Sequence, residues 1–216
     1  MKFGRYHAYS DLPHSLPLFP LTGAMLLPRG QLPLNIFEPR YLEMVEYALQ
    51  GDRLIGMIQP VENEETTLKP RLSQVGCAGK IVAFQETADN RYLITLAGVC
   101  RFRLTGEMQS ATAWRAGFCD FGAFAGDLAE SAGGELQRER LLHALKTYLT
   151  SRDMQADWNS VLTAPAEALV NALAMMCPFA PAEKQALLEA PSFHERASTL
   201  LALLEMGGEA GPTTMN

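Results

Sequence analysis

The sequence has no long hydrophobic run, no apolar segment within Met1–Ser15 and no strong excess of charge, and each shortage argues against a class of protein. No apolar stretch reaches the ~18 to 20 residues that cross a bilayer, so we expect no membrane partner. Met1–Ser15 is polar and has no apolar core, which argues against a secretory signal. With 48% hydrophobic and 19% charged residues, the composition is that of a folded globular protein. The sequence therefore predicts a folded, cytoplasmic protein.

Cysteine is scarce, and its spacing excludes the common cysteine motifs. The four residues lie far apart in the sequence, and none forms a C-x-x-C pair: Cys77, Cys100, Cys119 and Cys177. A zinc site or a redox dithiol would need such pairs. We therefore expect four reduced cysteines that are buried as small apolar side chains, without disulfide bonds.

The charge distribution gives no support for a nucleic-acid partner. The net charge is -6, and positive and negative residues balance over 1–120, so the acidic excess lies in 121–216. Proteins that bind nucleic acid gather a basic face to neutralise phosphates. Arg101 and Arg103 are too sparse to form one, and we expect no nucleic-acid partner.

Short segments with strand patterns precede residue 120. Over 100–105 apolar and polar residues alternate, which predicts a half-buried strand with Arg101 and Arg103 on its exposed face. Asp89 and Asn90 are turn residues that predict a hairpin. One helix interrupts the strands, because Pro39 suits a first helical position and Gly51 a last one. The expected strands of this curled antiparallel sheet cover 54–58, 81–87, 91–97, 100–105 and 112–119.

Helical patterns dominate after residue 120. Ser192 and Glu195 have the spacing of a capping box and predict the start of the last helix, which Gly207 and Gly208 should end. Glycine, alanine and serine are frequent over 122–134, which is typical of a flexible linker. We expect a barrel-like unit at 14–121, a linker at 122–134, a helical bundle at 135–206 and a disordered tail at 207–216. The expected apolar stripes of the bundle contain Leu141, Leu145, Tyr148, Leu149, Leu169, Leu173, Met176, Phe193, Ala197, Leu200, Leu201 and Leu204.

The sequence contains only incomplete versions of the familiar motifs of catalysis and metal binding. Gly79-Lys80 lacks the earlier glycine and the following Ser or Thr of a phosphate-binding loop. His194-Glu195 lacks the second histidine of a zinc-protease helix, because Ser198 stands there. The acidic run at 62–65 is interpreted as a solvated loop. We expect no catalytic residue, no metal and no cofactor, although a hydrolase whose residues meet only in space remains an alternative.

Several motifs, taken in order along the chain, resemble one known family. The first is the proline-rich opening 16–21, followed by 26–30 and 32–41, which reads LPLNIFEPRY. Later strand motifs, IGMI at 55–58 and VGCAGKI at 75–81, continue the likeness, as do 92–102 and the helical segment 183–196. Together, over about 14–206, the sequence resembles the N-terminal substrate-binding domain of Lon, the ATP-dependent protease.

This resemblance implies a fold and a function. The fold is α+β, with an N-terminal PUA-like β pseudo-barrel that one helix interrupts, followed by a C-terminal α-helical bundle. Lon proteases add an ATPase and a Ser-Lys peptidase, which this sequence does not contain, so the chain is similar to the stand-alone Lon-domain proteins of bacteria. The implied function is non-enzymatic binding of unfolded or flexible polypeptide, or of a protease or adaptor protein, by a monomer or weak homodimer. Because PUA-like barrels elsewhere bind RNA, RNA binding is a second alternative.

The candidate binding patch lies at the start of the interrupting helix: Asn35, Phe37, Glu38, Arg40 and Tyr41. An exposed aromatic ring beside a carboxylate and a guanidinium suits the capture of an extended chain. A purely structural interpretation of these residues is a serious alternative at this point. In it, Phe37 and Tyr41 pack the helix onto the barrel, and Glu38 interacts with the helix dipole.

Overall fold

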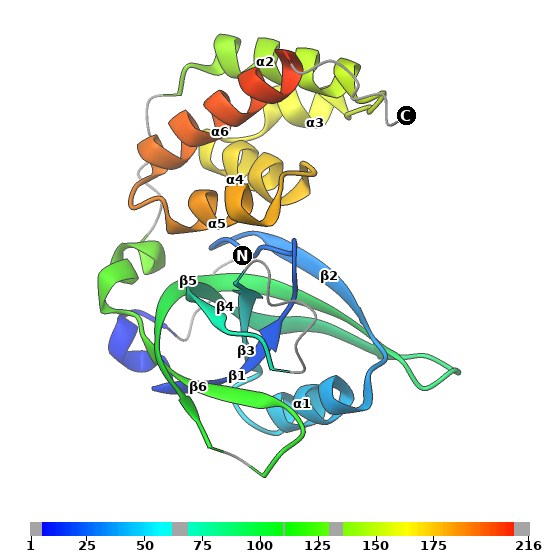
Figure 1. Ribbon diagram of the computed structural model, residues 1–216, viewed down its shortest axis with the longest axis vertical. Coiled ribbons are helices and arrows are strands. Elements are labelled where there is room, and N and C mark those ends of the chain that lie inside the picture. The colour runs from blue at the N-terminus through cyan, green and yellow to red at the C-terminus, as the bar shows by residue number, and fades with distance from the viewer. Residues whose placement is uncertain (1–5, 62–68, 110, 130–135, 210–216) are drawn as a thin grey trace.

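The structure is a computed structural model that describes residues 6–61, 69–109, 111–129 and 136–209. It has the α+β fold that the resemblance implies, with a curled sheet below and a layer of helices above (Figure 1). The strands are β1 (Ser15–Pro20), β2 (Gln31–Ile36), β3 (Leu54–Pro60), β4 (Leu72–Glu86), β5 (Tyr92–Met108) and β6 (Arg115–Asp120). The α-helices are α1 (Pro39–Gln50), α2 (Arg138–Ser151), α3 (Trp158–Thr163), α4 (Ala166–Met176), α5 (Pro181–Glu189) and α6 (Phe193–Glu209).

The sheet closes on itself through β5. The strand order is β2-β5-β4-β3-β1-β6, and β5 also pairs with β6. This is possible because β5 is 17 residues long: its first part pairs with β2 and its last part with β6. β1 and β3 are parallel, whereas we expected an antiparallel sheet throughout. The difference arises because β2 and α1 lie between β1 and β3 in the chain and form a crossover instead of a hairpin.

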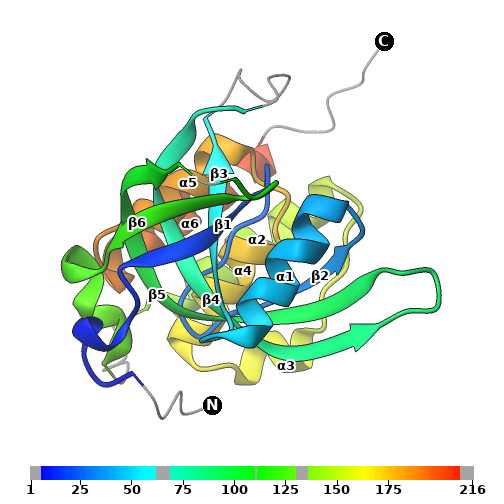
Figure 2. The same cartoon turned by 90° about the horizontal axis from the view of Figure 1, so that it is seen from below.

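The local signals at α1 and the hairpin are confirmed. Pro39 is the first residue of α1 and Gly51 is its C-cap. The β4–β5 hairpin turns at Asn90, which has a φ of 59°, a left-handed conformation that asparagine tolerates. Seen from below, α1 lies across the end of the barrel, and the hairpin projects beyond it (Figure 2).

The last helix begins at the predicted cap, where Ser192 and Glu195 bond each other. The Ser192 hydroxyl accepts a hydrogen bond from the Glu195 N–H at 3.2 Å and donates to the Glu195 carboxylate at 2.8 Å.

Met176 is an exception to the predicted apolar stripes of the bundle: it is the last residue of α4, and its side chain is 80% exposed. Most of the other predicted positions are buried, whereas Phe193 and Leu201 are partly buried.

The expected helix stop at Gly207 and Gly208 is wrong, because α6 continues to Glu209. A Cβ atom on Gly207 would lie 2.7 Å from the ring of Tyr148 in α2, so glycine allows the two helices to approach closely. Arg152 also donates a hydrogen bond to the Gly207 carbonyl at 2.7 Å. Residues 210–216 of the predicted tail lie outside the described residues.

The predicted linker begins with an ordered segment. A 3-10 helix, η2 (Gly122–Leu128), buries the ring of Phe124, so this part is not a flexible connection. Asp127 at its end binds Arg101 at 2.9 Å. Arg101 is therefore not on an exposed strand face as expected; it is 4% exposed. Residues 130–135 lie outside the part of the chain that the structure describes, and the domain boundaries remain a prediction.

The barrel and the helices meet through buried polar side chains. The described chain has five buried polar or charged residues, and four of them bond across this junction or to η2: Gln59, Arg101, Asn171 and Lys184. The fifth, Arg196, donates to the Asn171 side chain at 3.2 Å. Buried polar groups need such partners, so the junction has a defined geometry.

Candidate functional site

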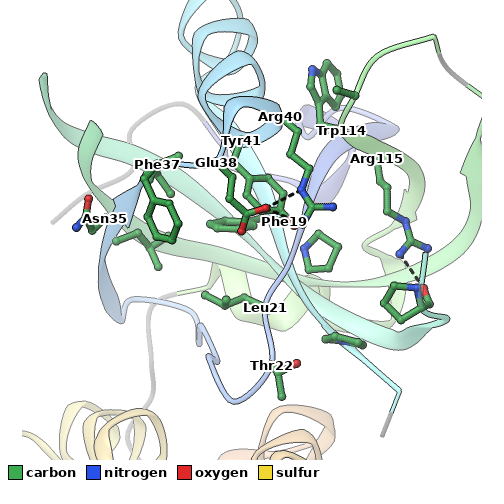
Figure 3. A pocket seen from close by; sticks show the side chains of 16 residues that line it. Phe19, Leu21, Thr22, Asn35, Phe37, Glu38, Arg40, Tyr41, Trp114 and Arg115 are labelled. Atoms are coloured by element: carbon green, nitrogen blue, oxygen red, sulfur yellow. Dashed lines mark hydrogen bonds and ion pairs between the residues drawn. The ribbon is translucent and has the colours of Figure 1, made fainter. Parts of the chain in front are cut away.

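A groove of about 370 Å³ opens beside the start of α1. Its walls come from the end of β1, the segment after it, β2, the first turn of α1 and the residues before β6 (Figure 3). The alternation of β2 explains part of this placement, because Leu34 and Ile36 face the barrel side and line the groove. We call this hollow the groove. Its lining residues are Phe19, Pro20, Leu21, Thr22, Leu34, Asn35, Ile36, Phe37, Glu38, Arg40, Tyr41, Pro60, Pro70, Ala113, Trp114 and Arg115.

All five residues of the predicted patch line the groove, but their environments differ. Phe37 is 60% exposed, and the guanidinium of Arg91 lies 5.7 Å from its ring centroid. Tyr41 is buried, with its ring centroid 4.4 Å from that of Phe19, and burial raises the pKa of its phenol. The structural interpretation therefore fits Tyr41, which packs α1 onto β1. It does not fit Phe37, whose ring is largely open to solvent.

Glu38 and Arg40 form an ion pair at the mouth of the groove. Nη2 of Arg40 lies 2.8 Å from a carboxylate oxygen of Glu38, and the Arg40 guanidinium lies 4.5 Å from the Tyr41 ring centroid. Glu38 is the N-cap of α1, yet its side chain makes no capping hydrogen bond. The carboxylate therefore orients Arg40 rather than capping the helix. Both side chains are nearly half exposed and can reach a ligand.

The opposite wall contains Trp114 and Arg115, which the sequence analysis did not single out. Arg115 makes two hydrogen bonds to Glu107, of 2.7 and 2.5 Å, and donates to the Pro70 carbonyl at 2.7 Å. The Arg115 hydrogen bonds lower the pKa of the Glu107 carboxyl. No local pattern could have placed these residues in the groove, because they reach it through the pairing of β6 with β1.

The cysteines are buried and free, as expected. Burial raises the pKa of Cys100 and Cys119 to about 12 and that of Cys177 to about 11, and it raises that of Cys77 as well. A thiolate nucleophile needs the opposite shift. Within the described ranges no group of three His, Cys, Asp or Glu side chains could hold a metal ion, and the acidic run at 62–65 falls outside those ranges.

No helix among the described residues is both long and apolar enough to cross a membrane.

Comparison with solved structures supports the fold. A Lon N-terminal domain protein from Xanthomonas campestris superposes with a TM-score of 0.61 at 24% identity, covering 87% of this chain and 97% of that one. The N-terminal domain of the Lon protease of the Mycobacterium avium complex gives a TM-score of 0.62 at 16% identity, covering 88% and 97%.

Sequence comparison identifies the family. Lon protease 2 of Myxococcus xanthus is 28% identical over 102 residues, which are 47% of this chain and 12% of that protein. Lon protease 2 of Sorangium cellulosum is 33% identical over 93 residues, or 42% and 11%. The chain thus matches a small part of these relatives. The model of the ATP-dependent protease La (LON) substrate-binding domain matches residues 15–206. The chain therefore belongs to the Lon substrate-binding domain family.

Proposed function

We propose that this protein is a non-enzymatic module that binds unfolded or flexible polypeptide in the groove. The observation that carries the proposal is the exposed ring of Phe37 at a hollow that apolar side chains help to line. Large exposed aromatic side chains beside a pocket are typical of sites that bind another chain. Membership of a family of substrate-binding domains supports this use of the groove.

The groove offers both kinds of contact that an unfolded chain needs. An apolar side chain of the ligand can pack between Phe37 and the lining residues Leu21 and Leu34. The Glu38–Arg40 pair can bond the ligand backbone, because a carboxylate accepts from N–H groups and a guanidinium donates to carbonyls. Neither contact requires a particular sequence. The groove therefore suits a broad range of flexible segments.

An amide NMR titration with an unfolded model polypeptide, without nucleotide, tests this proposal. Saturable shifts should centre on residues 35–41. The double variant Glu38→Ala with Arg40→Ala should bind several-fold more weakly, and Phe37→Ala about tenfold more weakly, as expected for ~1.4 kcal/mol at an aromatic contact. Because Glu38 and Arg40 form an exposed pair, its removal should change stability by about 0–1 kcal/mol.

The matched control removes a second exposed ion pair, Arg140 and Glu205, which joins α2 to α6 away from the groove. This control should bind like the unaltered protein. Unchanged binding of the Glu38→Ala with Arg40→Ala variant would place the binding surface elsewhere. If no polypeptide binds at millimolar concentration, a folded protease or adaptor becomes the better partner.

The sequence-based expectations of a cytoplasmic location and of a monomer or weak homodimer remain predictions. Light scattering coupled to size-exclusion chromatography checks the oligomeric state. Cleavage of casein without ATP would favour the hydrolase alternative, and salt-sensitive binding of structured RNA would favour the nucleic-acid alternative.

A further inference from the structure

Beside the groove, β2 has an open edge. Among the described strands β2 pairs only with β5, and β5, which is described throughout, contributes no residue to the groove. The groove therefore lies on the side of β2 that faces away from β5. Its other wall contains Phe19 and Pro20 of β1, where β1 pairs with β3 but no longer with β6. At the groove, therefore, no described strand joins β2 to β1.

The hydrogen-bond pattern shows which backbone groups of β2 face this open side. At the start of the β2–β5 pairing, the Gly98 N–H donates to the Gly30 carbonyl at 2.9 Å. Bonded residues alternate along an antiparallel pair, and the register shows no shift from Gln31 to Ile36. The even-numbered residues of β2 therefore bond to β5, and the odd-numbered residues point away from it. Pro33 fits this pattern, because proline has no N–H and is tolerated on an edge strand where no ladder bond is lost.

The β4–β5 hairpin leads to the same assignment from the other side of β5. The Thr87 N–H donates to the Arg91 carbonyl at 2.9 Å, so the odd-numbered residues that follow Arg91 bond to β4. The even-numbered residues at 92–96 then face β2, and the register places them opposite the even-numbered residues of β2. Two independent hydrogen bonds thus assign the same residues to the open edge.

Asn35 and Phe37 are the odd-numbered residues that line the groove from the β2 side (Figure 3). Both are exposed, and within the described ranges no group outside the sheet bonds to the N–H or the carbonyl of either residue. Phe37 directly follows β2, and Glu38 after it has extended dihedral angles, with φ −74° and ψ 132°. The edge therefore presents N–H groups and carbonyls to the groove in the alternation of a strand.

Unpaired backbone groups along a strand edge are complementary to the backbone of another extended chain. We infer that the polypeptide ligand binds in the groove as an added β-strand, whose backbone pairs with Asn35 and Phe37. The inference rests on the proposed function and deepens it, because it specifies the conformation of the bound ligand. Pro33 has no N–H and α1 begins at Pro39, so the pairing covers only a few residues. Backbone pairing does not depend on the ligand's side chains, which suits a module that binds many unfolded segments.

Amide hydrogen exchange followed by NMR tests the inference, with reduced and carboxymethylated α-lactalbumin as the unfolded ligand. At saturation the amides of Asn35 and Phe37 should exchange at least tenfold more slowly than in the free protein. A second open edge serves as the internal control. Beyond Lys80, β4 pairs only with β5 among the described strands, and Phe84 and Glu86 point away from β5 there without lining the groove. Their exchange should not change.

Two results of this experiment would overturn the inference. Unchanged exchange of Asn35 and Phe37 at saturation would mean that the ligand does not pair with β2, and slower exchange at Phe84 and Glu86 instead would place the added strand on β4. Slower exchange of Asn35 and Phe37 without ligand, as the protein concentration rises, would also overturn it, because a second copy of the chain would then occupy the edge.

Three variants separate backbone pairing from side-chain contact. Asn35→Pro removes the N–H that faces the groove and no bond to β5, and it should bind the same ligand at least fivefold more weakly. Asn35→Ala keeps this N–H and should bind within twofold of the unaltered protein. Gln31→Pro is the matched control, because Gln31 lies on the same open edge but does not line the groove, and it should also bind normally.

The outcomes distinguish this inference from the proposed function. Equal binding by Asn35→Pro and the unaltered protein, or equal losses in Asn35→Pro and Asn35→Ala, would refute strand addition while leaving the groove as the binding site. If Asn35→Pro does not fold, the exchange experiment on the unaltered protein decides. Absence of any shift at residues 35–41 in the unaltered protein would refute the proposed function itself.

Discussion

Replacing Arg101 should be among the most damaging single changes in this protein. Its guanidinium is buried, bonds both oxygens of Asp127 at 2.9 Å, and donates to the carbonyls of Leu188 and Ala190 at 3.0 and 2.6 Å. Arg101→Ala leaves a largely buried carboxylate and two carbonyls without these partners. Breaking a buried pair from one side costs about 3–5 kcal/mol, a large share of a typical total of ~5–15 kcal/mol.

Equilibrium unfolding in urea measures this loss, and Arg140→Ala provides the control. Arg140 makes the same two-bond contact with Glu205, at 2.7 and 2.9 Å, but both side chains are exposed, so its loss should cost about 0–1 kcal/mol. Arg101→Lys keeps the charge without the planar fork and should fall between the two. If Arg101→Ala and Arg140→Ala lose equal free energy, the junction does not depend on Arg101 and the reasoning is wrong.

Three further predictions concern the core. Leu200→Ala should lower the free energy of unfolding by about 2–5 kcal/mol, because Leu200 is fully buried. Leu201→Ala should lower it less, because Leu201 is only partly buried. Equal losses in urea would mean that the apolar stripe of α6 is assigned to the wrong face of the helix. A thiol reagent at pH 7 should label the native cysteines more than ~100-fold slower than the unfolded ones. Since the pKa of Cys100 is raised to about 12 from an ordinary 9.0, its contribution to stability is full below pH 9 and declines as the pH rises towards 12, which a pH series of urea transitions can detect.

Sequence patterns predicted the elements whose signals are local. Pro39 and Gly51 bound α1, Asp89 and Asn90 mark the β4–β5 hairpin, and Ser192 caps α6, because each of these depends on a few neighbouring residues. Composition was misleading over 122–128, where glycine and alanine are typical of a linker, yet the ring of Phe124 anchors a 3-10 helix. A single buried side chain outweighed the flexible composition around it.

The candidate site was partly predictable for the same reason. Phe37, Glu38 and Arg40 follow one another at the start of α1, so their proximity is local. The opposite wall is not, because Trp114 reaches the groove only after β6 has paired with β1. Arg101 shows the same limit. Its alternation with apolar neighbours predicts an exposed face, whereas its partners lie 26 to 89 residues further along the chain.

The helices of the C-terminal bundle support the groove without lining it. Leu21 and Thr22 form part of the groove, and the next residue, Gly23, has a φ of 71° and bonds in two directions. Its N–H donates to the Gln59 side chain at 3.1 Å, and its carbonyl accepts from Nζ of Lys184 in α5 at 2.7 Å. Burial lowers the pKa of Lys184, and its ammonium donates to the carbonyls of Gly23 and Met175 at 2.7 and 3.3 Å. The segment that contributes Leu21 and Thr22 to the groove is therefore held by the bundle, which gives a physical reason for a binding site on the barrel to need the helices beside it.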